Sequence, residues 1–140
     1  MTKLNRTQGK KLAVGQKKKT ISFCFSKLDV NQGQKIPEWE ALGLLSQFIA
    51  RTQQIAAYEY DQALAQQMIK QYTQVGFPPK SEFTEPKHVT PQYWAVIHIT
   101  ANSKEVVAGF LEDNVFYIVF LDKDHKFWPT NIQNRGKVKR

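Results

Sequence analysis

The chain has 140 residues, of which 41% are hydrophobic and 12% aromatic. This length and composition fit one domain with a hydrophobic core and exclude a fully disordered chain. Its single cysteine, Cys24, excludes an intrachain disulfide and is typical of a reducing compartment, and we expect it to be a small buried apolar side chain. No apolar run approaches the roughly 20 residues of a membrane span, and the N-terminus lacks the apolar segment of a secretory signal, so we expect a cytoplasmic protein with no membrane contact.

The formal net charge of +8 is unevenly distributed along the chain. Residues 1–19 contain seven Lys or Arg and residues 132–140 contain four, with no acid in either segment, so residues 20–131 carry nine basic against twelve acidic residues. We therefore predict a flexible basic tail over 1–19, a single domain over 20–131 and a basic C-terminal tail over 132–140. Such tails commonly contact polyanions, although they can also serve only to keep a protein in solution.

Hydrophobic periodicity predicts one strand and two helices in the first half of the chain. Apolar residues alternate in 20–26, which indicates a half-buried strand. From Pro37 to about Ile55 they recur every three to four residues, and from Tyr60 to Tyr72 every four, before Gly76 and two prolines stop the pattern. The short break between these segments predicts an antiparallel helical hairpin.

After a proline-rich loop over 77–91, three runs rich in β-branched and aromatic residues predict a meander of strands. They span about 93–100, 104–111 and 115–121, and a charged, aromatic segment from Asp122 to Trp128 follows the last one. The predicted fold class is α+β: a helical hairpin packed on a four-stranded, mainly antiparallel sheet.

Sequence motifs for common cofactors and metals are absent from the chain. We find no phosphate-binding loop, no dinucleotide-binding glycine motif and no Cys/His zinc spacing, so we predict neither cofactor nor metal. The three histidines, His88, His98 and His125, are far apart in sequence. His98 shares a strand face with Trp94 and Val96, and we interpret it as a histidine of the sheet rather than a ligand.

Over about residues 20–128, the order of elements resembles the RelE/ParE superfamily of toxins from toxin–antitoxin systems. The resemblance is carried by Tyr93-Trp94, by Lys104-Glu-Val-Val-Ala-Gly109, by the apolar run from Asn114 to Leu121 and by Asp124-His-Lys-Phe-Trp128. The helical hairpin matches in order and length only, and the tails do not match. The resemblance implies a RelE-like fold and a toxin as the function.

Many toxins of this superfamily are ribosome-associated endoribonucleases that cleave mRNA without a metal, through attack of the ribose 2′-OH on the next phosphate. That resemblance implies His125 as the acid/base residue, with Lys104 and Lys126 as charge stabilisers. Lys104 stands where the family usually has Arg, which would give a bidentate grip on phosphate. The implied partners are mRNA, the ribosome and a cognate antitoxin protein.

The resemblance also implies a set of residues that bind nucleic acid, either by charge or by stacking on a base. These are Lys80, Lys87, His88, Phe127 and Trp128. Two alternatives stay open: a non-catalytic inhibitory toxin with a gyrase-type target, and a small basic module that binds RNA or the ribosome. For His125 itself, the alternative interpretation is a polar strand-end residue that fixes the turn after Leu121.

Overall fold

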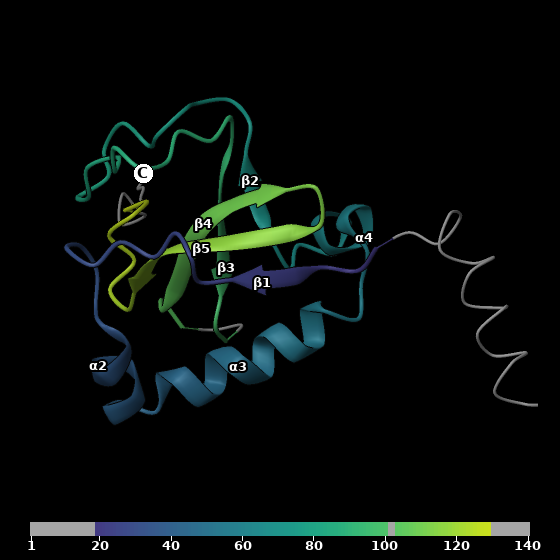
Figure 1. Cartoon of the computed structure of the whole chain (residues 1–140), viewed down its shortest axis with the longest axis horizontal. Helices are drawn as coiled ribbons and strands as arrows, with labels where there is room; N and C mark the ends of the chain where they lie inside the picture. The colour runs from purple at the N-terminus through teal and green to yellow at the C-terminus, as the bar shows by residue number, and fades with distance from the viewer. Residues whose placement is uncertain (1–18, 101–102, 130–140) are drawn as a thin grey trace, which may run out of the picture.

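A computed structural model describes residues 19–100 and 103–129 of the chain (Figure 1). The predicted basic tails therefore lie outside the described residues, apart from Lys19. The described part contains three helices and five strands, which confirms the α+β class. In chain order these are β1 (Ser22–Cys24), α2 (Ile36–Ala41), α3 (Leu44–Ile55), α4 (Tyr60–Ala65), β2 (Lys70–Tyr72), β3 (Trp94–His98), β4 (Val106–Glu112) and β5 (Val115–Asp122).

The strands form one mixed sheet in the order β1-β5-β4-β3-β2. Strands β3, β4 and β5 pair antiparallel in sequence order, as the meander predicts, and β2 pairs antiparallel with β3, whereas β1 pairs parallel with β5. The predicted count of four strands is wrong, because β2 adds a fifth strand at the edge beside β3.

Both predicted helices are longer than the observed ones, the first because of a glycine conformation and the second because of strand pairing. Gly43 takes a left-handed conformation (φ 76°) and divides the first predicted helix into α2 and α3. The second predicted helix ends at Ala65, and residues 70–72 turn into strand β2. The spacing of four from Tyr60 to Tyr72 suits a helix, but pairing of β2 with β3 satisfies the same backbone groups and carries Tyr72 to the sheet.

The two faces of the sheet are covered by different kinds of structure (Figure 1). Helix α3 packs on one face, where Phe48 and Ile55 belong to the same hydrophobic core as Ile97 of β3. The long connection from β2 to β3 and the segment after β5 cover the other face, which buries Trp94 and Phe127. Successive side chains of β3 alternate between these two cores, as strand geometry requires.

A bulge in β5 interrupts the regular pairing of β4 with β5. Ala108 pairs with Phe120 and Gly109 with Ile118, so Val119 is an extra residue in β5. A Cβ on Gly109 would lie 1.9 Å from the carbonyl oxygen of Tyr117, which explains the need for glycine there. None of the helices in 19–100 and 103–129 is long and apolar enough to cross a membrane.

Candidate functional site

A pocket of about 360 Å³ opens at the edge of the sheet beside β2. Its walls come from β2, from the end of β3, from the β3–β4 connection and from the segment after β5. We call it the histidine pocket, and its lining residues are Lys70, Tyr72, His98, Ser103, Lys104, His125 and Trp128. Three of the residues predicted from sequence therefore meet there, namely Lys104, His125 and Trp128.

Two imidazoles face each other in the histidine pocket. The ring centroids of His98 and His125 are 5.5 Å apart, with an angle of 39° between the ring planes. His125 has φ 60°, a conformation that is uncommon for residues other than glycine and that recurs at functional sites. Its Nδ1 lies 2.7 Å from the carbonyl oxygen of Trp128. A carbonyl only accepts hydrogen bonds, so Nδ1 carries a proton and Nε2 is the ring atom left to exchange one.

The surroundings of His98 favour its uncharged form. Partial burial lowers the pKa of His98 below its ordinary value of 6.5, and the charge of His125 and, more weakly, of Lys70 and Arg51 acts in the same direction. A backbone hydrogen bond with Ser103 opposes these effects without reversing them. His98 is therefore mostly neutral at pH 7 and able to accept a proton.

An aromatic pair forms one wall of the histidine pocket. The rings of Tyr72 and Trp128 stack at 4.4 Å with only 8° between their planes, and Lys70 Nζ lies 5.6 Å from the centroid of Tyr72. Burial raises the pKa of the Tyr72 hydroxyl well above its ordinary range, so this hydroxyl stays protonated. Trp128 remains partly exposed, which leaves aromatic surface open at the pocket.

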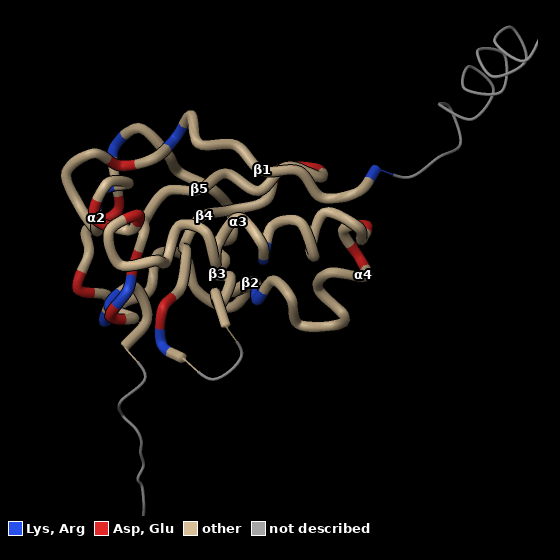
Figure 2. Tube along the Cα trace, turned by 90° about the horizontal axis from the view of Figure 1, so that it is seen from below, with Lys and Arg blue, Asp and Glu red and all other residues tan. Residues whose placement is uncertain are grey.

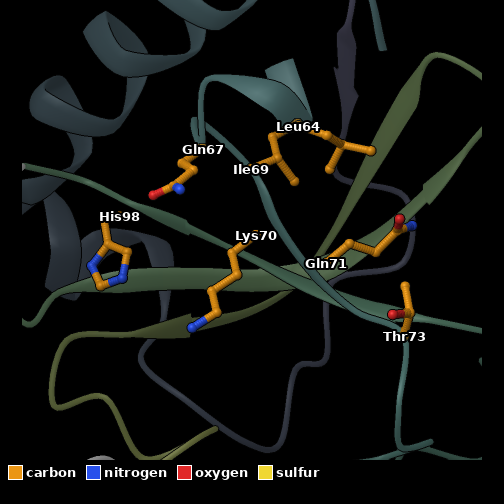
Figure 3. Close-up of a pocket in the computed structure, with 7 residues that line it drawn as sticks. All are labelled: Leu64, Gln67, Ile69, Lys70, Gln71, Thr73 and His98. Carbon is orange, nitrogen blue, oxygen red and sulfur yellow. The ribbon is translucent and has the colours of Figure 1, made fainter. Parts of the chain in front are cut away.

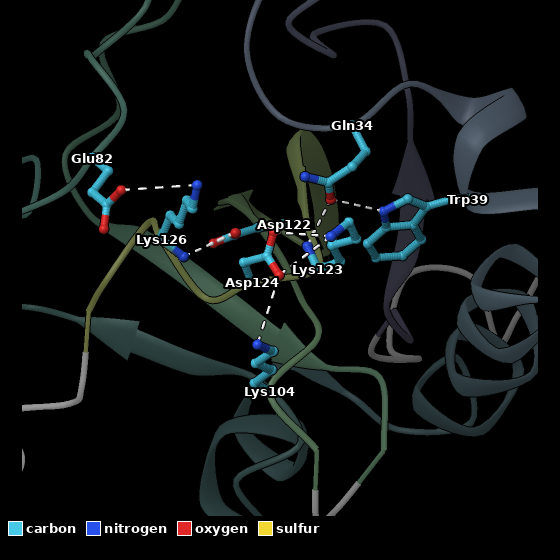
Figure 4. A network of polar contacts seen from close by, with 8 residues as sticks. All are labelled: Gln34, Trp39, Glu82, Lys104, Asp122, Lys123, Asp124 and Lys126. Atoms are coloured by element: carbon cyan, nitrogen blue, oxygen red, sulfur yellow. Dashed lines mark hydrogen bonds and ion pairs between the residues drawn. The ribbon is translucent and has the colours of Figure 1, made fainter. Parts of the chain in front are cut away.

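Buried and surface carboxylates hold the loop that carries His125 (Figure 4). Asp122 is fully buried, and its carboxylate accepts hydrogen bonds from the backbone N–H groups of Lys126 (2.9 Å) and Phe127 (2.7 Å). Burial nevertheless raises the pKa of Asp122. The hydrogen bond from Lys123 lowers the pKa of Asp124, which also lies 3.7 Å from Lys104. The Trp128 carbonyl, and not an aspartate, holds Nδ1 of His125.

Two of the predicted residues after β5 turn away from the histidine pocket. Lys126 Nζ points to Glu82, 4.0 Å from its carboxylate, and the Lys126 carbonyl accepts the Glu82 backbone N–H (Figure 4). Phe127 has no exposed surface and packs against Trp94 and Phe120. A ring without exposed surface cannot stack on a base, so Phe127 belongs to the core and its predicted role in binding is corrected.

The predicted basic residues of the β2–β3 connection are not brought to His125. Lys87 and His88 line a separate hollow of about 530 Å³ with Asp29 and Gln32, and His88 Nε2 lies 2.9 Å from the carbonyl oxygen of Lys27. Lys80 is exposed and lines neither hollow. Figure 2 shows basic and acidic residues intermixed along the described chain rather than sorted to opposite sides.

Sequence reasoning missed four residues of the pocket: Lys70, Tyr72, His98 and Ser103. The first two were assigned to a helix, and their place became visible only through the pairing of Lys70 with Val96 and of Tyr72 with Trp94. The face of His98 was predicted correctly, because Trp94 and Val96 share its side of the sheet. Its position at the last residue of β3, where a strand emerges from the core, was the available sign of a functional role.

In the part of the chain that the structure describes, no three His, Cys, Asp or Glu side chains come together as a metal site. No family model, no curated protein and no solved structure matches this chain. The case for a function therefore depends on the geometry of the histidine pocket.

Proposed function

We propose that the protein is a metal-independent endoribonuclease whose active site is the histidine pocket. The observation that carries this proposal is the pair of facing imidazoles, with ring centroids 5.5 Å apart, beside two lysines and a partly exposed indole. Cleavage of RNA by its own 2′-OH needs a base, an acid and positive charge near the phosphate, and these are the groups present.

In the proposed reaction, His98 is the general base because its lowered pKa keeps it neutral near pH 7. It takes the proton of the 2′-OH as that oxygen bonds to the neighbouring phosphorus. His125 donates a hydrogen bond from Nδ1–H to the Trp128 carbonyl. Its Nε2 gives a proton to the 5′-oxygen as the phosphorus–oxygen bond breaks. The products are a 2′,3′-cyclic phosphate and a free 5′-hydroxyl, so no co-reactant is required.

The lysines of the pocket supply the charge that this reaction needs. Lys70 and Lys104 would stabilise the extra negative charge that develops on the phosphate oxygens. The ion pair of Lys104 with Asp124 is long (3.7 Å) and Lys104 is mostly exposed, so the lysine can leave this weak pair for a phosphate. The exposed part of Trp128 offers a surface on which an unpaired base can stack.

The direct test is cleavage of a single-stranded RNA by the purified full chain in the presence of a metal chelator. His125→Asn suits the left-handed backbone at this position, and His98→Gln keeps a polar side chain of similar length. Each should lower the rate by about 10²–10⁴, whereas His88→Asn, which changes a histidine outside the pocket, should leave it unchanged.

Two results would contradict the proposed nuclease activity of the histidine pocket. Full activity in both pocket variants would place the chemistry elsewhere, and binding of RNA without a cyclic phosphate product would favour the non-catalytic RNA-binding module. The DNA strand of the same sequence lacks the 2′-OH and should not be cleaved, which tests whether this group is the nucleophile.

We also propose, on the resemblance to RelE/ParE proteins alone, that the nuclease is a toxin that acts on ribosome-bound mRNA and has a cognate antitoxin. Regulated expression in bacteria should then arrest growth and shorten transcripts, and His125→Asn should relieve both effects. Growth that continues unchanged during expression of the wild-type chain would count against the toxin assignment while leaving the nuclease test unaffected.

A further inference from the structure

A second hollow, of about 600 Å³, lies next to the histidine pocket across Lys70 (Figure 3). We call it the Gln67 hollow, and its lining residues are Leu64, Gln67, Ile69, Lys70, Gln71, Thr73 and His98. Lys70 and His98 line both cavities, so a ligand held at the two imidazoles would continue directly into this second space.

The side chain of Gln67 is placed to meet such a ligand. Figure 3 shows its amide and the amine of Lys70 extending toward the His98 ring, while Gln71 and Thr73 lie at the other end of the hollow. Gln67 is exposed, with φ 60°, and it follows the C-cap residue of α4, Gln66, at the turn into β2. The amide of Gln71 is already engaged, because its Oε1 accepts the Tyr60 hydroxyl at 3.3 Å.

The chemistry of the hollow fits a flat, polar-edged molecule. Leu64 supplies apolar surface, and the Gln67 amide presents one donor and one acceptor side by side. This pair of groups matches the Hoogsteen edge of an adenine, where the ring nitrogen N7 accepts and the neighbouring amino group donates, whereas guanine presents two acceptors there. An unstacked base of single-stranded RNA can present such an edge to a protein.

We infer that the Gln67 hollow binds the nucleobase next to the scissile phosphate, adenine in preference to the other three, with Gln67 as the residue that sets this preference. The inference rests on the proposed function in one respect: one RNA strand runs through both cavities, with its phosphate at Lys70 and His98. It adds a base-reading subsite that the reaction itself does not require.

The test measures binding separately from cleavage. Short RNAs with 2′-O-methyl groups cannot be cleaved by 2′-OH attack, and a set that differs only in one base can be compared by filter binding to the full chain. Wild-type protein should bind the adenine member at least about five- to tenfold more tightly than the others. Gln67→Gly should remove this preference without loss of the fold, because glycine readily adopts the positive φ of this position.

Gln53→Ala is the matched control, since it removes an exposed glutamine from α3, outside the hollow, and should leave the preference unchanged. Binding without base preference in the wild type, or a preference that survives in Gln67→Gly, would overturn the subsite. A Gln67-dependent preference for another base would overturn the adenine assignment. A base preference in binding without any cleavage of RNA would support the subsite and refute the nuclease. Cleavage of RNA with no base preference that depends on Gln67 would support the nuclease and refute the subsite.

Discussion

At the scale of single residues, the buried carboxylate of Asp122 holds the segment that carries His125. Its two oxygens accept the backbone N–H groups of Lys126 and Phe127. An asparagine offers only one oxygen, so its amino group would face a backbone donor and leave that donor unsatisfied. We expect Asp122→Asn to lower the free energy of unfolding by about 1–3 kcal/mol, measured by urea denaturation.

Asp113→Asn provides the comparison for this prediction. Asp113 lies in the exposed β4–β5 turn and pairs with Lys19 at the surface, so its loss should change stability by less than about 0.5 kcal/mol. Equal stability of the two variants would show that the Asp122 hydrogen bonds do not hold this segment.

The pH dependence of the protein should follow His98. Its folded pKa lies below the ordinary 6.5, so as pH falls the unfolded chain takes up the proton first. Stability must therefore decrease as pH falls below about 6.5. The rate of cleavage must fall at lower pH, where the folded His98 itself takes up a proton and can no longer act as base. Thermal midpoints and rates between pH 5 and 8 test this, and His98→Gln should flatten the stability profile. A cleavage rate that shows no fall on the acidic side, down to the pH at which the protein unfolds, would exclude His98 as the base.

At the scale of elements, Gly109 is the position at which the sheet tolerates least change. A Cβ there would lie 1.9 Å from the Tyr117 carbonyl oxygen and 3.0 Å from the Phe116 ring, and the backbone oxygen cannot move without opening the β4–β5 pairing. Gly109→Ala should therefore destabilise the protein by at least about 1–3 kcal/mol in chemical denaturation.

Gly76→Ala is the matched substitution, because an added Cβ there meets nothing within 4 Å. It should leave the unfolding midpoint nearly unchanged. If the two alanine variants have the same unfolding midpoint, the β4–β5 pairing at the bulge must be able to open enough to accommodate the added methyl group.

The elements that sequence predicted well are those with a strong local pattern. Strands β3, β4 and β5 are rich in apolar, β-branched and aromatic side chains, and the alternation around Phe23 marked β1. Strand β2 has only three residues, and its Lys70-Gln71-Tyr72 carries no such pattern. Its conformation depends on the edge of β3, which is a contact across more than twenty residues that no local spacing records.

The residues of the candidate site that lie next to recognised strands could be predicted from sequence, and those on the missed strand β2 could not. His125, Lys104 and Trp128 follow or precede strands that were recognised, so their convergence could be anticipated. Lys70 and Tyr72 depended on the missed strand. Lys126 and Phe127 lie between His125 and Trp128 in the sequence, yet the hydrogen bonds to Asp122 turn them toward the β2–β3 connection and the core. Backbone geometry, and not residue type, decides this orientation.

At the scale of the whole molecule, the excess of basic residues lies in the two terminal segments, 1–19 and 132–140, whereas residues 20–131 contain more acidic than basic residues. Residues 1–17 carry five Lys or Arg and no acid. Their removal should weaken binding of single-stranded RNA and reduce the slope of log K against log salt, by at most about 3.5 if every one of the five charges contacts a phosphate. Binding isotherms at several salt concentrations test this, and an unchanged slope would mean that the segment does not contact RNA.

The stacking of Trp128 on Tyr72 gives the molecule an intrinsic optical reporter. The other two tryptophans, Trp39 and Trp94, are completely buried, so a collisional quencher such as iodide can reach only Trp128. The accessible fraction of the intrinsic fluorescence should therefore report on the histidine pocket alone. A nucleotide that occupies the pocket should shield this indole and reduce quenching, and Trp128→Phe should abolish the accessible component. Occupancy of the site can then be followed during turnover in the unlabelled protein.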